Sequence, residues 1–534
     1  MLLMAASAVI TVAAYAQQAA SGDTYMAAGM ATEDLNGTAR YVGMGGAMEA
    51  LGADMSVIGT NPAGIGMFRK NQFAGGLSVI SQSDGKSFGD GSKTNASLDQ
   101  MGIVFSTRSG KHSFLNFAFN YHKSRNFNYV LSAANALNGS AQNSQTVFKD
   151  MNGLIPSNFS LPYSQLDALY INNMNTKEGV HDPVTGQTNI VSTSGIVDYA
   201  FDRYEFDRAH TGYIGEYDFN ISGNINNRVY LGLTVGIDAV HYKGYSEYYE
   251  TLNDDNFRRD YFRDVLISDN QKITGYGYNV KAGIIFRPLA ESAFRIGAAI
   301  ATPTFYKLTL DNYTTIGTNV DESSANEDFR FNTPWKFNLS VGHTIGNKLA
   351  LGAVYEYADY STCDMRTIDS YNYEFQAEES SSDPAMKRHI QKSLNGVSTL
   401  KLGAELKPDK NISLRAGYNY VSSAYKSSAV RDQTLMSPGV YYASTTDYTN
   451  WGDTHRFTAG IGFNIEKVRL DFAYQYQTRN GDFYPFMKDY SASYYETDAN
   501  GNETGNIITL HNSCEPVKVK DNRHQLLATF TYTF

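Results

Sequence analysis

The feature of this sequence that most constrains its fold is a long series of segments in which apolar and polar residues alternate. Such alternation is typical of β-strands that face two different environments. About fourteen of these segments follow residue 70, an even number like that of bacterial single-chain membrane barrels. Each is at least as long as the ~9–11 residues that a tilted strand needs to cross a bilayer. They occupy residues 71–82, 99–108, 112–123, 210–226, 228–243, 271–288, 292–310, 327–345, 347–362, 393–407, 410–425, 453–465, 468–480 and 519–534.

Short and long connections between these segments alternate strictly along the chain. The short ones are centred on residues 109–111, 226–227, 288–291, 346–347, 408–409 and 466–467, and the long ones cover 83–98, 124–209, 244–270, 311–326, 363–392, 426–452 and 481–518. Outer-membrane barrels have short periplasmic turns and longer extracellular loops. A soluble β-sandwich has no reason to separate its loops in this way. We therefore predict an all-β protein, a transmembrane antiparallel β-barrel of about fourteen strands over residues 71–534, in the bacterial outer membrane.

The composition agrees with a barrel and excludes other classes. Charged residues make up only 18% of the chain, which contains 39 Tyr, 29 Phe and 46 Gly. Past the N-terminus no apolar run approaches the ~18 residues of a membrane helix. A net charge of −10 argues against nucleic acid as a partner, because a protein surface that binds nucleic acid is basic.

The two ends of the chain carry targeting signals. Residues 1–16 are apolar and end in Ala14-Tyr15-Ala16, an A-x-A cleavage pattern that predicts a signal peptide. No Lys or Arg precedes the apolar stretch, so either the start lies upstream or the signal is atypical. At the other end, a strand with Leu526, Ala528, Phe530 and Tyr532 on one face terminates in Phe534. A terminal aromatic residue of this kind resembles the signal read by the barrel assembly machinery.

Residues 37–69 resemble neither a strand nor a polar loop. Met44, Ala47, Met48 and Leu51 follow the spacing of a short amphipathic helix. Asn61-Pro62 imposes a turn, because proline fixes φ and disfavours helix at the preceding residue. We expect residues 17–70 to form a compact plug, or hatch, inside the barrel. Few side chains would anchor it, so its gating residues are predicted to be Gly43, Gly45, Gly46, Asn61, Pro62, Ala63 and Gly64.

The string RYVGMGGAMEALGADMSVIGTNPAGIGMFR, residues 40–69, closely resembles the N-terminal region of the FadL/TodX-type outer-membrane transporters of long-chain fatty acids and aromatic hydrocarbons. The resemblance covers about thirty residues in motif and the whole chain in layout. It implies a fourteen-stranded barrel with an N-terminal hatch that contains Asn61, Pro62 and Ala63. It also implies a lateral opening beside a kinked early strand, yet residues 112–123 contain no Gly or Pro to mark a kink.

The second long connection contains a further helical pattern. Leu166, Leu169, Tyr170 and Ile171 can share one face. In the family that the motif resembles, large extracellular loops form an apolar capture site, so this face is either part of a ligand groove or the inner side of a lid helix packed on neighbouring loops. Together with Met44, Met48 and Leu51, these residues are the candidate ligand contacts.

No motif indicates a metal, a cofactor or a catalytic centre. The ten histidines lack metal-binding spacing. His112, His122 and His241 are candidates for haem ligands, or else lie in the barrel wall or an aromatic girdle. Cys363 and Cys514 are either free or joined by one bridge.

The predicted function is passive uptake of a hydrophobic small molecule through loop capture, hatch movement and release. Two alternatives are a receptor for haem or another surface ligand, and an outer-membrane barrel enzyme. The expected partners are the ligand, outer-membrane lipid and lipopolysaccharide, and the barrel is expected to be a monomer.

Overall fold

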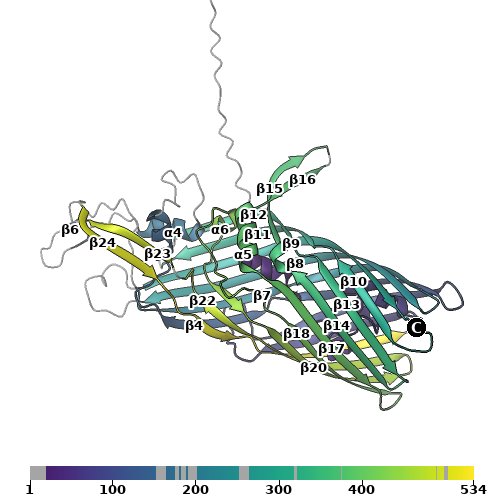
Figure 1. Ribbon diagram of the computed structural model, residues 1–534. Coiled ribbons are helices and arrows are strands. Elements are labelled where there is room, and N and C mark those ends of the chain that lie inside the picture. Colours follow the sequence, from purple (N-terminus) through teal and green to yellow (C-terminus); the bar gives the residue numbers. More distant parts are fainter. Residues whose placement is uncertain are drawn as a thin grey trace, which may run out of the picture.

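The chain forms a closed antiparallel β-barrel, as seen in a computed structural model (Figure 1). The structure describes residues 20–151, 164–174, 180–181, 188–189, 201–251, 264–317, 321–374, 376–488, 490–497 and 503–534. Fourteen strand positions succeed one another around the wall, and β1 closes it by pairing with both β2 and β26. The wall strands are β1 (Gln72–Gln82), β2 (Thr94–Arg108), β3 (Phe114–Asn126), β7 (Arg203–Ile225), β8 (Val229–Thr251), β9 (Asp264–Phe286), β10 (Arg295–Ala301), β13 (Lys336–Ile345), β14 (Leu349–Asp359), β17 (Gly396–Leu406), β18 (Ile412–Val421), β20 (Thr454–Ile465), β21 (Val468–Thr478) and β26 (Arg523–Thr533). The predicted fold class and strand number are confirmed.

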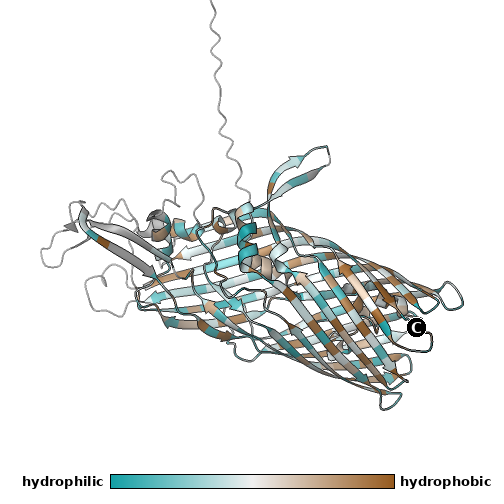
Figure 2. Ribbon diagram, viewed as in Figure 1, coloured by the Kyte–Doolittle hydropathy of each residue, from teal (hydrophilic) through white to brown (hydrophobic). Residues whose placement is uncertain are grey.

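The outer face of the wall is apolar in the half that carries the short turns and the C-terminus (Figure 2). On β8, Leu231, Leu233, Val235 and Ile237 are exposed, whereas Tyr230, Thr234 and Asp238 at the alternate positions are buried. This pattern places alternate side chains toward lipid and toward the lumen. None of the helices in the described residues has the length and apolar character needed to cross a membrane.

Several strands extend beyond this apolar band. At 23 residues each, β7, β8 and β9 reach well into the extracellular region. The wall strand β10 continues after Pro303 as β11 (Phe305–Ile316), and β12 (Asp321–Asn332) precedes β13 across Pro334. Proline cannot donate a ladder hydrogen bond, so both strands break there.

The extracellular connections are folded and packed over the residues that the structure describes. They contain the helices α3 (Ser144–Met151), α4 (Gln165–Met174), α5 (Pro384–Ser393) and α6 (Pro438–Tyr441) and the short helix η4 (Tyr360–Thr362). Their strands are β4 (Tyr129–Ala136), β5 (Val180–His181), β6 (Thr188–Asn189), β15 (Asp364–Asn372), β16 (Ala377–Ser382), β19 (Tyr448–Trp451), β22 (Asn480–Tyr484), β23 (Tyr490–Thr497), β24 (Glu503–Asn512) and β25 (Val517–Lys520). Cys363 and Cys514 are both buried and free.

Residues 20–69, which we call the luminal segment, pack against the inner faces of the wall strands. The segment contains α1 (Thr24–Ala31), α2 (Ala39–Gly43), η1 (Met55–Gly59) and η2 (Pro62–Met67). The helix expected at Met44–Leu51 is wrong: these residues form turns. Gly45 and Gly46 have φ of +61° and +79°, which a right-handed helix does not allow. The predicted signal peptide, residues 1–16, lies outside the described residues.

The resemblance implies a kinked early strand, and β3 is irregular at the end of the predicted segment 112–123. The ladder between β3 and β7 shifts register between Lys123 and Arg125, although neither Gly nor Pro is present. The β2–β3 ladder ends at Gln100↔His122, whereas β2 begins six residues earlier, at Thr94. The chain then passes into β4, which pairs with β7. β2 and β3 are therefore not paired toward the extracellular side of the wall, and we call the opening between them the parting.

Candidate functional site

The luminal segment rests on a row of glycines in the barrel wall. Lumen-facing glycines occur on eight consecutive wall strands, namely Gly232, Gly283, Gly297, Gly342, Gly352, Gly403, Gly417 and Gly460. A Cβ added at Gly352 would lie 1.9 Å from the carbonyl oxygen of Ala47, and one at Gly403 would lie 2.2 Å from that of Met44. At Gly283 it would lie 2.1 Å from Oδ1 of Asn61. Only glycine lets the two backbones approach this closely.

Ion pairs also join the luminal segment to the wall. Arg40 donates to both carboxylate oxygens of Glu405, at 3.0 and 3.2 Å. Burial alone would lower the pKa of Arg40, but pairing with Glu405 raises it above its ordinary value. Glu49 is fully buried and accepts from Lys401 at 3.1 Å. The expectation that few side chains anchor this segment is therefore wrong, since the wall supplies partners that the segment's own sequence does not reveal.

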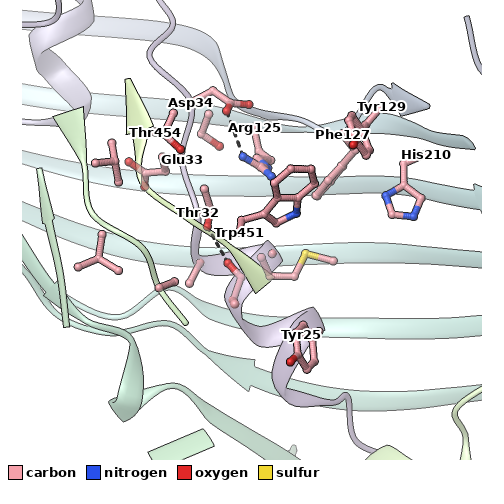
Figure 3. A pocket seen from close by; sticks show the side chains of 18 of the residues that line it. Tyr25, Thr32, Glu33, Asp34, Arg125, Phe127, Tyr129, His210, Trp451 and Thr454 are labelled. Atoms are coloured by element: carbon pink, nitrogen blue, oxygen red, sulfur yellow. Dashed lines mark hydrogen bonds and ion pairs between the residues drawn. The ribbon is translucent and has the colours of Figure 1, made fainter. Parts of the chain in front are cut away.

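The luminal segment also bridges the parting between β2 and β3. Nδ2 of Asn36 donates to Oδ1 of Asp99 on β2 at 3.2 Å and to the carbonyl of Lys123 on β3 at 3.1 Å. Two residues earlier, the Asp34 amide donates to the Ser124 carbonyl at 2.8 Å. The Asp34 carboxylate accepts from Arg125 at 3.0 Å, a contact drawn in Figure 3. Burial alone would raise the pKa of Asp34, but Arg125 and Arg456 hold it below its ordinary value.

A cavity of about 320 Å³ lies between the luminal segment and the extracellular connections (Figure 3). Its walls come from α1 and the residues after it, from β3, β4, β7, β8 and β20, and from the connection before β20. Rings and apolar side chains form part of the lining, including Tyr25, Met30, Phe127, Tyr129, Tyr425 and Trp451. The cavity therefore has apolar surface with polar groups set among it, an arrangement that suits an amphiphilic molecule.

Six arginines line the same cavity, namely Arg125, Arg208, Arg431, Arg456, Arg479 and Arg523. They share four carboxylates: Asp34 pairs with Arg125 and Arg456, Asp447 with Arg208, Asp23 with Arg431, and Asp521 with Arg479 and Arg523. Arg479 lies 4.2 Å from the ring centroid of Trp451, and Arg523 lies 5.6 Å from that of Tyr129. The resulting excess of guanidinium groups favours an anionic group at this end of the cavity.

A second polar cluster at the cavity is an ion-pair network. His122, Glu216 and Asp218 bring potential metal-ligand atoms within 4.8 Å of one another. However, Lys281 bonds to both Glu216 and Asp218, the second at 3.2 Å. The ammonium group therefore already supplies the cation that these carboxylates require. His122 contacts the same two carboxylates, at 3.5 and 3.3 Å.

The candidate ligand contacts from the sequence lie away from the cavity. Met44, Met48 and Leu51 are buried in the core of the luminal segment, where they pack with Tyr41 and Val42. Leu166, Leu169 and Tyr170 lie on α4 in an apolar core shared by the extracellular connections, together with Phe483 and Phe486. α4 includes Ile171, whose side chain is outside the described part of the chain. None of these six described side chains lines the cavity.

Among the predicted gating residues, Asn61 caps η2 by accepting from the Ala63 amide at 3.2 Å. Pro62 and Ala63 contact Gly232 of the wall, and Gly64 lies beside Val57 within the segment. Gly43 and Gly45 contact Gly460 and Gly417, while Gly46 packs on Leu35. All of them lie where the segment meets the wall or folds on itself.

Sequence reasoning missed the wall glycines, Asp34, Asn36 and the cavity arginines. A signal existed for the glycines, since glycine inside a strand often marks close backbone approach. No comparable signal marks Asp34 and Asn36, because their partners are 91 and 63 residues away in the sequence. Four of the arginines come from four different strands, and Arg431 and Arg479 come from the residues between strands.

Comparison with known proteins agrees with this geometry. No protein-family model matches the sequence. Outer membrane protein P1 of Haemophilus influenzae is 27% identical over 188 residues, which is 34% of this chain and 38% of that protein. The chain thus matches well under half of that relative's length.

Solved structures share the architecture. A Pseudomonas aeruginosa FadL homologue superposes with a TM-score of 0.50 at 13% identity, covering 94% of this chain and 100% of that one. The Ralstonia pickettii toluene transporter TbuX gives a TM-score of 0.45 at 12% identity, covering 94% and 99%. The likeness to the FadL homologue is one of fold, and at that level the resemblance seen at residues 40–69 is confirmed: this chain is a closed fourteen-stranded β-barrel with the architecture of that protein.

Proposed function

We propose that this protein is an outer-membrane channel for passive uptake of hydrophobic small molecules, in which residues 20–69 serve as the hatch. The observation that carries the proposal is the cavity between the luminal segment and the extracellular connections. Its rings and apolar side chains suit a hydrophobic body, and its six arginines suit an acidic end. The preferred ligand is therefore an amphiphile with an anionic group.

The mobile part of the hatch is proposed to be residues 32–36, next to the cavity. Residues 43–64 lie against the wall glycines and are hard to move. Residues 32–36 are held differently, by polar contacts: Asn36 bridges β2 and β3 through two side-chain hydrogen bonds. Displacement of this short stretch would connect the cavity with the parting in the wall. A ligand that binds the displaced state better would shift the population toward it without energy input.

The family and fold argue for a channel over an outer-membrane enzyme. A haem receptor has less support from the described histidines. His112 and His241 are exposed and do not line the cavity. His122 lines it but is held by Glu216 and Asp218. Titration with hemin, followed through its visible absorption, separates that alternative from hydrocarbon or fatty-acid uptake.

The decisive experiment compares uptake of radiolabelled dodecanoate and dodecane by cells that produce the protein. Replacing Arg479 and Arg523 together with glutamine removes two charges and keeps polar side chains. We expect at least tenfold slower uptake of dodecanoate and little change for dodecane. Lys348→Gln, in an exposed turn far from the cavity, is the matched control. Equal uptake of dodecanoate by all three proteins would contradict the proposal.

A further inference from the structure

A group of basic side chains lies on the outer surface of the barrel, away from the cavity. It consists of Lys123, His241, Lys243 and Lys272, which we call the basic patch. On β8, Asp238 and Tyr242 are lumen-facing, so the alternate residues His241 and Lys243 point outward, and both are exposed. Lys243 is directly opposite Lys272 of β9 in the ladder. These side chains therefore share one face of the wall.

Aromatic contacts make the patch continuous across β3, β7, β8 and β9. Nζ of Lys123 lies 4.6 Å from the ring centroid of Tyr213 on β7. The ring of Tyr213 lies 5.3 Å from that of His241. Above the patch, Tyr245 stacks on Phe88 of the β1–β2 connection with ring centroids 5.4 Å apart. The β1–β2 connection thus bounds the patch on its extracellular side.

The charges in the patch are not balanced within the protein. Like charges directly opposite each other in a ladder are destabilising, yet Lys243 and Lys272 are such a pair. In the described part of the chain, neither forms an ion pair with an acid. The nearest acids in the ladder are Asp311, opposite Lys272, and Glu247, which accepts from Tyr245. Three lysines against Asp311 and Glu247 leave one positive charge without an acid on this face.

The height of the patch matches the headgroup region of the outer leaflet. Exposed Tyr276 and Tyr278 on β9, with Tyr217 and Phe219 on β7, form an aromatic row at the upper edge of the apolar band. Lys272 lies four residues beyond Tyr276 toward the extracellular side. At ~3.4 Å per residue and a tilt of about 40°, this is roughly 10 Å above the aromatic row. Aromatic rings mark the membrane interface, so the lysines lie among polar headgroups.

We propose that the basic patch binds the phosphorylated headgroup of an outer-leaflet glycolipid. A phosphate placed between Lys243 and Lys272 accepts charge-assisted hydrogen bonds from both ammonium groups and removes their repulsion. The acyl chains then lie along the aromatic row and the apolar band below. Charge complementarity and height in the membrane point to this occupant, because a soluble protein partner would have to enter the headgroup layer to reach the lysines.

Native mass spectrometry of the detergent-solubilised barrel tests the proposal, with bisphosphorylated lipid A and its dephosphorylated form as probes. We expect the wild-type protein to retain the phosphorylated lipid at least tenfold better than the dephosphorylated one. The variant with Lys243→Gln and Lys272→Gln should lose this preference. The variant with Lys348→Gln and Lys410→Gln, changed at exposed periplasmic turns, should keep it.

Folding of each variant is verified by its heat-modifiable migration on gels. Lys272→Arg, which keeps the charge, should retain the phosphorylated lipid even if the double variant folds poorly. Equal retention of the two lipids by the wild type would overturn the proposal. So would undiminished preference in the folded Lys243/Lys272 double variant.

Discussion

Replacing Gly352 with alanine tests whether close backbone contact holds the luminal segment in place. The new Cβ would lie 1.9 Å from the carbonyl oxygen of Ala47. Real Cβ atoms essentially never approach closer than 3.0 Å, so the two backbones must separate by about 1.1 Å. Both colliding groups are main chain, and no side-chain rotation relieves the contact. Overpacking of this kind costs about 1–3 kcal/mol.

This free-energy cost applies only to the seated state, in which the luminal segment lies against the wall, because a displaced segment no longer contacts the wall at Gly352. A difference of about 1–3 kcal/mol corresponds to a roughly 5–150-fold change in an equilibrium constant. The population of displaced segment should therefore rise by that factor. Hydrogen exchange of residues 43–52 should accelerate by a similar factor, and proteoliposomes should become leaky to a small dye.

Gly75→Ala is the matched control for this measurement. Gly75 also lies in a wall strand, but its added Cβ would have its nearest neighbour at 3.9 Å, an ordinary contact. We expect wild-type exchange and wild-type leakage. If Gly352→Ala behaved like Gly75→Ala in both assays, the glycine row would not be what seats the luminal segment.

Three further predictions concern the luminal segment and the extracellular core. Asp34 has a lowered pKa in the folded protein. Its contribution to stability is therefore present above about pH 4, the unfolded value, and is lost as the pH falls through the folded value. Hydrogen exchange of residues 32–36 should accelerate in that pH range in the wild type and be fast at all pH values in Asp34→Asn. Arg40→Gln removes two charge-assisted hydrogen bonds to Glu405 and should destabilise the seated segment by about 1.5–3 kcal/mol, measured as faster proteolysis of residues 20–69 against a Lys70→Gln control. Leu169→Ala leaves a cavity in the extracellular core and should lower the unfolding free energy of that region by about 2–5 kcal/mol. Dodecanoate uptake should stay within twofold, since Leu169 does not line the ligand cavity. A loss of uptake without a loss of stability would instead place Leu169 at the ligand.

The wall was predictable from sequence because apolar and polar residues alternate with a period of two along a lipid-facing strand, and one sequence is enough to show this pattern. All fourteen positions were found, most within a few residues of their observed ends. The large errors occur where the environment changes along a strand. β9 begins at Asp264, seven residues before the predicted segment, because residues 268–272 are all polar and interrupt the alternation.

The parting between β2 and β3 had no sequence marker, for a physical reason. Its register shift lies between Lys123 and Arg125, and no residue there is a strand breaker. The unpaired ladder groups are compensated by Asp34 and Asn36 of the luminal segment. A kink stabilised by partners about 90 residues away leaves no local pattern.

The wall glycines show how the sequence could have revealed more than a barrel. Gly342, Gly352, Gly403 and Gly417 are direct neighbours in successive ladders from β13 to β18. Glycine weakens a strand because it adds chain entropy and offers no side chain to pack, so a row of four across adjacent strands would be a defect in an empty barrel. It becomes favourable only if another backbone occupies the space that the missing side chains leave. Lumen-facing glycines in register are therefore evidence from the wall itself for a segment inside it, independent of the motif at residues 40–69.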